Sequence, residues 1–253
     1  MSLPWPELNY SQWHATCDTL HAHTQVLGKL AAKLAPPEPQ LQHAALRLTT
    51  RGWETLPLPA PDRSGALTIR LDLHSHEAVT EHSDGRVERV PLTPNRPVGD
   101  VTREVLAEYR APFRGRSTPV NAWWGSFDLS VSLFSGRPAH PPAQDFIMRN
   151  AMDAQEVAVG WWPGDPRYGQ AAFYAYAHPA TEGYPQAVLS PAGAHWDGQL
   201  GEFVLDWDDV RAAEDPHAAA VTFARSAFQH ACRVCDWDPA LAASADGTPP
   251  PVH

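Results

Sequence analysis

Two stretches of the chain alternate strictly between apolar and polar residues, and this period of two constrains the fold most. Residues 67–74 and 125–134 carry a leucine, isoleucine, valine or phenylalanine at every second position. Successive side chains of a strand point to opposite faces, so the pattern predicts strands with one buried face and one polar face. Further β-prone runs occupy residues 44–51, 78–82, 86–91, 155–162, 171–178 and 201–207.

Turn and helix signals complete the predicted architecture. Asp84-Gly85 lies between two β-prone runs, which is a strong hairpin signal. Asp215 followed by Pro216 is typical of a helix start. Helical patterns occupy residues 11–34, 99–111 and the segment after Pro216. We therefore predict an α+β fold, a tryptophan-rich antiparallel sheet with packing helices at the N-terminus, in the middle and at the C-terminus.

The length of 253 residues suits one domain. We expect residues 1–241 to form it and residues 242–253 to be a flexible tail. Each half has a helix, a Gly-basic pair and a strand that ends in a glycine turn. Residues 9–98 and 99–241 are thus candidates for two diverged helix-plus-sheet repeats, with sheets that join or face each other.

The charge balance limits the partners that this chain can have. The net charge is −10 and no run of lysine or arginine occurs, which argues against nucleic acid and against an anionic membrane surface. No apolar run is long enough to span a membrane, and the N-terminus lacks the features of a signal peptide. These features predict a cytoplasmic protein. Three cysteines do not make a disulfide framework. The oligomeric state cannot be read from the sequence.

Several motifs are shared with a known family. The motifs are STPVNAWWGSFDL at residues 117–129, WPG at 162–164 and AFYAY at 172–176. Through them the chain resembles a bacterial family of domains of unknown function, family 5996, as a shortened and diverged member. The resemblance implies no particular activity. It also implies that the segment between Leu92 and Arg116 lacks roughly fifty residues that relatives have.

The same resemblance shows three places where a histidine of the family pattern is replaced. In residues 39–43, only the last histidine of the family pattern remains, as His43. At position 121 the histidine is replaced by Asn121, and in residues 153–155 it is replaced as well. Three histidines that are lost together suggest a metal or catalytic cluster in relatives. The resemblance therefore implies that such chemistry has been lost in this chain.

The best candidate site is the polar face of the predicted strands. Each tryptophan doublet, 123–124 and 161–162, places one ring on each face of its strand, and an exposed tryptophan favours a ligand. The structural alternative is that helices cover both faces of the sheet, so that every tryptophan lies in the core. The candidate ligand-binding residues are Arg51, Asp72, His74, Asn121, Trp124, Tyr174 and Tyr176. The candidate acid/base residues are His43, Asp128 and Glu156.

Other constellations are weaker. His14, Asp18 and His21 share one helix face, but an exposed polar ridge explains them as well. Cys232 and Cys235 lie inside a helix without a second pair, so we interpret them as structural. No metal site is assigned and no cofactor is identified. Three hypotheses stay open: a small-molecule-binding protein, a hydrolytic or metal-assisted enzyme, and a scaffold without a ligand.

Overall fold

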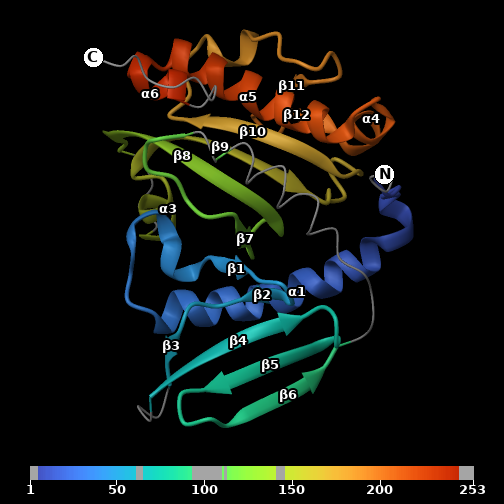
Figure 1. Cartoon of the computed structure of the whole chain (residues 1–253), viewed down its shortest axis with the longest axis vertical. Coiled ribbons are helices and arrows are strands. Elements are labelled where there is room, and N and C mark those ends of the chain that lie inside the picture. Colours follow the sequence, from blue (N-terminus) through green and yellow to red (C-terminus); the bar gives the residue numbers. More distant parts are fainter. Residues whose placement is uncertain (1–4, 61–64, 93–109, 111–112, 141–145, 245–253) are drawn as a thin grey trace.

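The structure, a computed structural model, describes residues 5–60, 65–92, 110, 113–140 and 146–244. Within these residues, twelve antiparallel strands form one sheet, ordered β11-β12-β10-β9-β8-β7-β1-β2-β4-β5-β6, with β3 paired to β4 (Figure 1). The α+β fold class is thereby confirmed. The strands are β1 (Leu46–Leu48), β2 (Gly52–Glu54), β3 (Leu58–Pro59), β4 (Ala66–Asp72), β5 (Glu77–His82), β6 (Val87–Pro91), β7 (Asn121–Trp123), β8 (Asp128–Pro138), β9 (Ala154–Trp162), β10 (Ala172–His178), β11 (His195–Asp197) and β12 (Glu202–Asp206).

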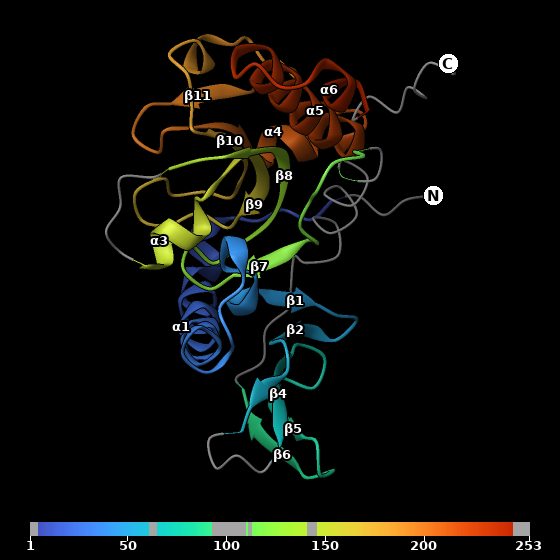
Figure 2. The ribbon, with the colours of Figure 1, turned by 90° about the vertical axis from the view of Figure 1, so that its left-hand side faces the viewer.

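Helices flank the sheet on two sides. Seen edge-on, α1 and α3 lie on one side and α5 and α6 on the other (Figure 2). The helices are α1 (Tyr10–Leu34), the 3-10 helix η1 (Pro39–Ala44), α3 (Phe146–Ala151), the 3-10 helix η2 (Tyr184–Gln186), α4 (Trp207–Ala212), α5 (Pro216–Val234) and α6 (Pro239–Ser244). None of the helices in the described ranges combines the length and the apolar character that a membrane crossing needs.

The sheet consists of two meanders that join at β1 and β7. The join is short, with Leu46 opposite Ala122 and Arg47 opposite Asn121. From it, β1-β2-β4-β5-β6 runs outward in one direction and β7-β8-β9-β10-β12 in the other. The two halves of the chain thus have the same strand order about a central antiparallel pair. This arrangement is consistent with two diverged repeats.

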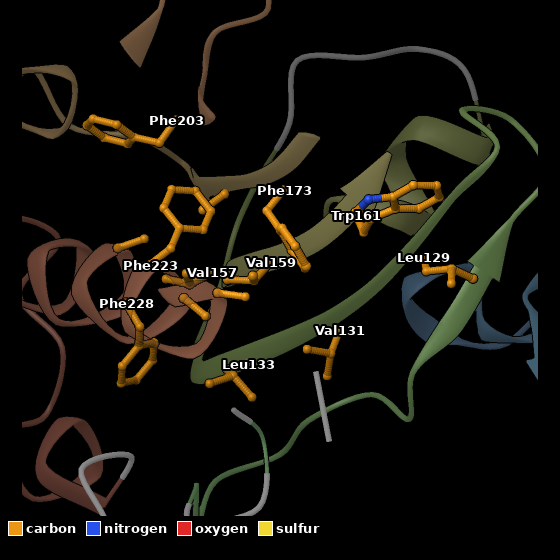
Figure 3. Packing of buried hydrophobic residues seen from close by; sticks show 14 of the residues in the cluster. Leu129, Val131, Leu133, Val157, Val159, Trp161, Phe173, Phe203, Phe223 and Phe228 are labelled. Carbon is orange, nitrogen blue, oxygen red and sulfur yellow. The ribbon is translucent and has the colours of Figure 1, made fainter. Parts of the chain in front are cut away.

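The main core lies between α5 and one face of the second meander. Its residues recur at every second strand position, as the alternation requires. Figure 3 shows part of this core and labels Leu129, Val131, Leu133, Val157, Val159, Trp161, Phe173, Phe203, Phe223 and Phe228. Each buried Phe or Leu contributes about 1.5–3 kcal/mol. α5 therefore covers this face of the second meander, and the cavity described below lies over the opposite face.

The N-terminal segment packs against α4, next to the end of β12. Trp5 stacks on Trp207 with ring centroids 5.2 Å apart, and Trp207 Nε1 donates a 3.0 Å hydrogen bond to the carbonyl of Pro6. α1 then begins after the N-cap residue Asn9, whose side chain accepts a hydrogen bond from the Ser11 N–H at 3.2 Å. From there α1 crosses the molecule toward the first meander (Figure 1).

Several predicted elements are present and others need correction. The first helix, the Asp84-Gly85 hairpin and the Asp215 cap are confirmed. The predicted strand 125–134 is wrong at its start, because residues 124–127 form the β7–β8 turn, with Phe127 at φ 59°.

Three further expectations differ from the structure. The expected strand 44–51 is reduced to β1, because η1 extends to Ala44 and residues 49–51 form a turn. α6 continues past residue 241 to Ser244, and the rest of the expected tail lies outside the described residues. The expected helix 99–111 lies almost wholly outside them as well.

Candidate functional site

A cavity of about 930 Å³ lies over the polar face of the second meander. α1 and η1 wall it on one side, and the loops after β9 and before β12 wall it on another. Its floor follows from the strand alternation: each strand that buries an apolar residue against α5 turns the next residue toward the cavity. The floor residues are Asp128, Ser130, Ser132, Glu156, Trp162, Tyr174, Tyr176 and Glu202.

Tyr174 and Asp128 form the first of two tyrosine–carboxyl pairs. The Tyr174 hydroxyl donates to Asp128 Oδ2, reaching from β10 over β9 to β8. It can do so because Gly160 of β9 stands opposite Tyr174 and has no side chain. A Cβ there would lie 2.4 Å from Tyr174 Cζ. The glycine is therefore required for the close approach of the ring.

Tyr176 and Glu156 form the second pair. The Tyr176 hydroxyl donates to Glu156 Oε1 at 3.4 Å, and Ser132 also bonds this carboxyl group. The Tyr174 and Tyr176 rings stack with centroids 6.3 Å apart and planes 3° from parallel. The two pairs thus lie side by side on the floor of the cavity.

Burial dominates the electrostatics of these carboxyl groups. Burial raises the pKa of Asp128 to about 6, although hydrogen bonds from Tyr174 and Ser126 oppose the shift. Burial raises the pKa of Glu156 to about 7 against the opposing effects of Ser132, Tyr176 and Arg116. Burial and the charge of Asp128 raise the pKa of Glu202 to about 7. All three therefore change protonation close to neutral pH.

His178 adds a nitrogen base beside Glu156. The two residues are register partners on β10 and β9. Burial lowers the pKa of His178, and a hydrogen bond with the Met152 backbone opposes this shift. Its Nε2 atom is buried and has no hydrogen-bond partner among the described residues. The ring therefore favours the neutral form, with one nitrogen bonded to the Met152 backbone and Nε2 left without a partner.

The α1 wall combines a buried thiol with a fixed histidine. His21 Nε2 lies 3.0 Å from the Trp124 carbonyl, and its ring stacks on Phe127 with centroids 5.2 Å apart. Burial, together with Asp18, raises the pKa of the Cys17 thiol to about 12. A thiol of such high pKa is a poor nucleophile. This wall can therefore shape the cavity but offers no activated cysteine.

At the end of the cavity, the three stretches with replaced histidines meet. Gln40 Nε2 donates to Asp153 Oδ1, and Asn121 Nδ2 donates to Gln42 Oε1 at 3.1 Å. Gln40 and Leu41 both have left-handed backbones, with φ of 53° and 54°. Such strain in non-glycine residues is maintained by surrounding contacts and is common at functional sites.

Five of the ten candidate site residues line this cavity, namely Trp124, Asp128, Glu156, Tyr174 and Tyr176. The structure places the other five elsewhere, in two groups.

Three of them form a cluster in the first meander. Arg51 Nε donates to Asp72 Oδ2, and Asp72 also accepts the N–H groups of His74 and Ser75. His74 Nε2 lies 3.1 Å from the Thr50 carbonyl. These contacts join the β2 and β4 ends and stabilise the turn after β4.

The other two candidates are buried at η1, His43 within it and Asn121 in contact with it. His43 Nδ1 accepts the Glu38 N–H at 3.0 Å, and Asn121 bonds Gln42. Both side chains are about 1% exposed. Neither lines the cavity, so His43 is not placed beside Asp128 or Glu156.

Sequence reasoning missed Ser130, Ser132 and Glu202 of the floor, and also His178 of the lining and Gly160 beneath the Tyr174 ring. For His178 a signal existed, because it continues the alternate positions of Tyr174 and Tyr176. Glu202 is the first residue of its strand, a position at which the sequence alone suggests a solvent-exposed side chain. In the described part of the chain, no group of three or more His, Cys, Asp or Glu side chains is placed to hold a metal ion.

The fold and the cavity define an α+β protein with one antiparallel sheet, helices on both faces and an acidic, aromatic-walled cavity. The chain belongs to the family of unknown function DUF5996, whose model matches residues 5–107 and 100–244. The two matches correspond to the first and second meanders. Comparison with curated proteins and with solved structures gives no match.

Proposed function

We propose that this chain is a cytoplasmic protein that binds a small polar molecule in the cavity between α1 and the second meander. The ligand packs against Trp162, Tyr174 and Tyr176 and forms hydrogen bonds with the buried carboxyl groups. Aromatic walls with a few convergent polar groups are typical of small-molecule sites.

The burial of Asp128 and Glu156 is the observation that carries this proposal. Their side chains are about 95% buried, at 5% and 4% exposure. Burying carboxyl groups is unfavourable, and apolar residues would stabilise the sheet better. Titratable groups with perturbed pKa values, gathered in a cavity, support a binding or reactive role.

A ligand screen by thermal shift, followed by calorimetric titration of each hit, tests the proposal. Tyr176→Phe removes one hydroxyl group from the floor, and Tyr168→Phe makes the same change outside the cavity lining. We expect hits to bind about tenfold more weakly to Tyr176→Phe and unchanged to Tyr168→Phe. The proposal is wrong if every hit binds both variants like the parent chain.

An acid/base enzyme is the second candidate, and one observation favours it. The pKa values of Asp128 and Glu156, raised to about 6 and about 7, would let one group donate a proton while the other accepts one. A hydrolytic reaction would use this pair. Turnover of a screened ligand that disappears in both Asp128→Asn and Glu156→Gln would establish this reading; binding without turnover would exclude it for that ligand.

A further inference from the structure

Negative charge exceeds positive charge among the described residues that line the cavity. The one arginine among its described lining residues, Arg167, is paired with Asp165, with Arg167 Nη2 2.6 Å from the carboxylate. The remaining carboxyl groups face the cavity without a lysine or arginine that also lines it, and they are Asp18, Asp128, Glu156 and Glu202. A ligand that brings positive charge would compensate them.

The polar atoms at the floor are mainly acceptors. Tyr174 and Tyr176 use their hydroxyl protons on Asp128 and Glu156, so their oxygens can only accept a further hydrogen bond. His178, at the end of the same strand β10, offers the same property through a ring nitrogen. Because its other nitrogen bonds the Met152 backbone, the buried and unpartnered Nε2 presents a lone pair. A matching ligand must therefore supply hydrogen-bond donors.

The aromatic side chains add a preference for positive charge over neutral donors. The floor contains Trp162 and the parallel rings of Tyr174 and Tyr176. The faces of aromatic rings attract cations, by about 0.5–2 kcal/mol depending on desolvation. A polyol would satisfy the acceptors but would leave the negative charge uncompensated.

The anionic groups occupy two points of the cavity. Glu156 stands opposite Phe134 of β8 and beside His178. Asp128 begins β8, at the far end from Phe134. Glu202 precedes Phe203, which pairs with Ala175, so Glu202 stands next to Tyr176 in the sheet. Because Asp128 and Glu156 belong to separate tyrosine–carboxyl pairs, a chain with spaced ammonium groups matches them better than a single ammonium group.

We propose that the ligand of this cavity is a linear aliphatic polyamine, with one ammonium group at Glu156 and His178 and another at Asp128, and with Glu202 contributing further negative charge beside Tyr176. This inference rests on the proposed function, since it names the ligand class of the same site. The binding requires ionised carboxylates and a neutral imidazole, so affinity increases with pH through the neutral range. The groups that face these carboxyls and influence their ionisation are Tyr174, Tyr176, Ser126, Ser132, Arg116, Asp153, His178 and Asp197.

Calorimetric titration of the full chain with spermidine tests the inference, with sorbitol as the neutral polyol and magnesium chloride as a simple cation. We expect spermidine to bind at about pH 8 and at least about tenfold more weakly at about pH 5.5. Glu202→Gln should weaken binding by about tenfold, because it removes one carboxylate and disrupts no hydrogen bond that we observe. Glu77→Gln is the matched control, since Glu77 lies on β5 and pairs with Arg89 outside the cavity.

The outcomes separate the inference from the proposed function. Binding of spermidine that depends on Glu202 and exceeds that of magnesium supports the polyamine. The polyamine inference is wrong if magnesium binds as tightly as spermidine. It is also wrong if sorbitol or another neutral compound binds in the cavity and spermidine does not. In both cases the proposed binding function stands. If the thermal-shift screen yields no ligand whose binding is weakened by Tyr176→Phe, both the polyamine inference and the proposed function are wrong.

Discussion

The Tyr174 ring passes so close to Gly160 that a methyl group on this glycine would overlap Tyr174 Cζ at 2.4 Å. The position of the ring allows its hydroxyl group to cross β9 and reach Asp128. One missing side chain thus permits a hydrogen bond between strands that are not neighbours in the sheet.

Gly160→Ala should displace the Tyr174 ring and break its bond with Asp128. We expect a loss of roughly 1–3 kcal/mol in the free energy of unfolding, measured by urea denaturation. Gly198→Ala is the control, because a Cβ there would meet no atom within 4 Å, and its effect should stay within about 0.5 kcal/mol. Equal stabilities of the two variants would contradict the packing described for Tyr174.

Glu156→Gln should stabilise the chain above neutral pH in the absence of ligand. The folded pKa of Glu156, about 7, exceeds its ordinary value of 4.5, so the folded state binds this proton more tightly than the unfolded state. Stability from this group is present below about pH 4.5 and is lost as the pH rises through about 7. The variant should therefore gain up to roughly 3 kcal/mol at about pH 8 and nothing at about pH 4.

Urea denaturation over this pH range measures the difference between the Glu156→Gln chain and the parent. The Glu77→Gln control on β5 should show no such rise with pH. If the advantage of Glu156→Gln were the same at both ends of the range, titration of Glu156 would not be its cause.

Asp72→Asn should destabilise the first meander at neutral pH by roughly 1–3 kcal/mol. Burial alone would raise the pKa of Asp72, but the Arg51 side chain and the Ser75 and His74 N–H groups outweigh it and hold the pKa well below 3.8. Stability from a depressed carboxyl pKa is present above about pH 4 and is lost as the pH falls below it. The destabilisation should thus shrink in acid, which urea denaturation at several pH values will show.

Arg51→Ala gives a graded comparison. The Arg51 side chain is 49% exposed, so its ion pair with Asp72 is screened by water and contributes at most about 1 kcal/mol. A larger loss in Arg51→Ala than in Asp72→Asn would mean that the turn hydrogen bonds of Asp72 matter less than its charge.

Gly28→Ala should destabilise the chain although alanine favours helices. In an open helix this change gains about 1 kcal/mol. At position 28, however, the new Cβ would lie 1.9 Å from Trp124 Cγ, so the indole ring must move. A fall in the melting temperature is expected, whereas Val26→Ala, at a 57% exposed position of the same helix, should change it little. A higher melting temperature for Gly28→Ala would refute the Gly28–Trp124 contact.

The sequence predicts the regular parts of this fold because their signals are local. Strand alternation, the Asp84-Gly85 turn and the Asp215 cap each act within a few residues. The turn at residues 124–127 was missed because alternation continues through it, and only the left-handed Phe127 shows that the chain reverses. The ring of Phe127 is held there by His21 of α1, a contact about one hundred positions away that no local pattern contains.

The site was predicted in part for the same reason. Asp128, Tyr174 and Tyr176 belong to alternating strands, so their shared face could be inferred from parity alone. His43 has similar chemistry, but the path of η1, through two left-handed residues, turns it toward the Glu38 backbone. Glu202 and His178 join the site through strand pairing, which depends on the whole sheet.

The short β1–β7 join has a consequence for folding. It brings together residues about 75 positions apart, whereas most other strand pairs link segments that are close in the chain. Closing such a long loop is entropically unfavourable, so the two meanders should form early and dock late. A chain cut between β6 and β7 would then be expected to reassemble from its two fragments, because the cut removes none of the β1–β7 pairing.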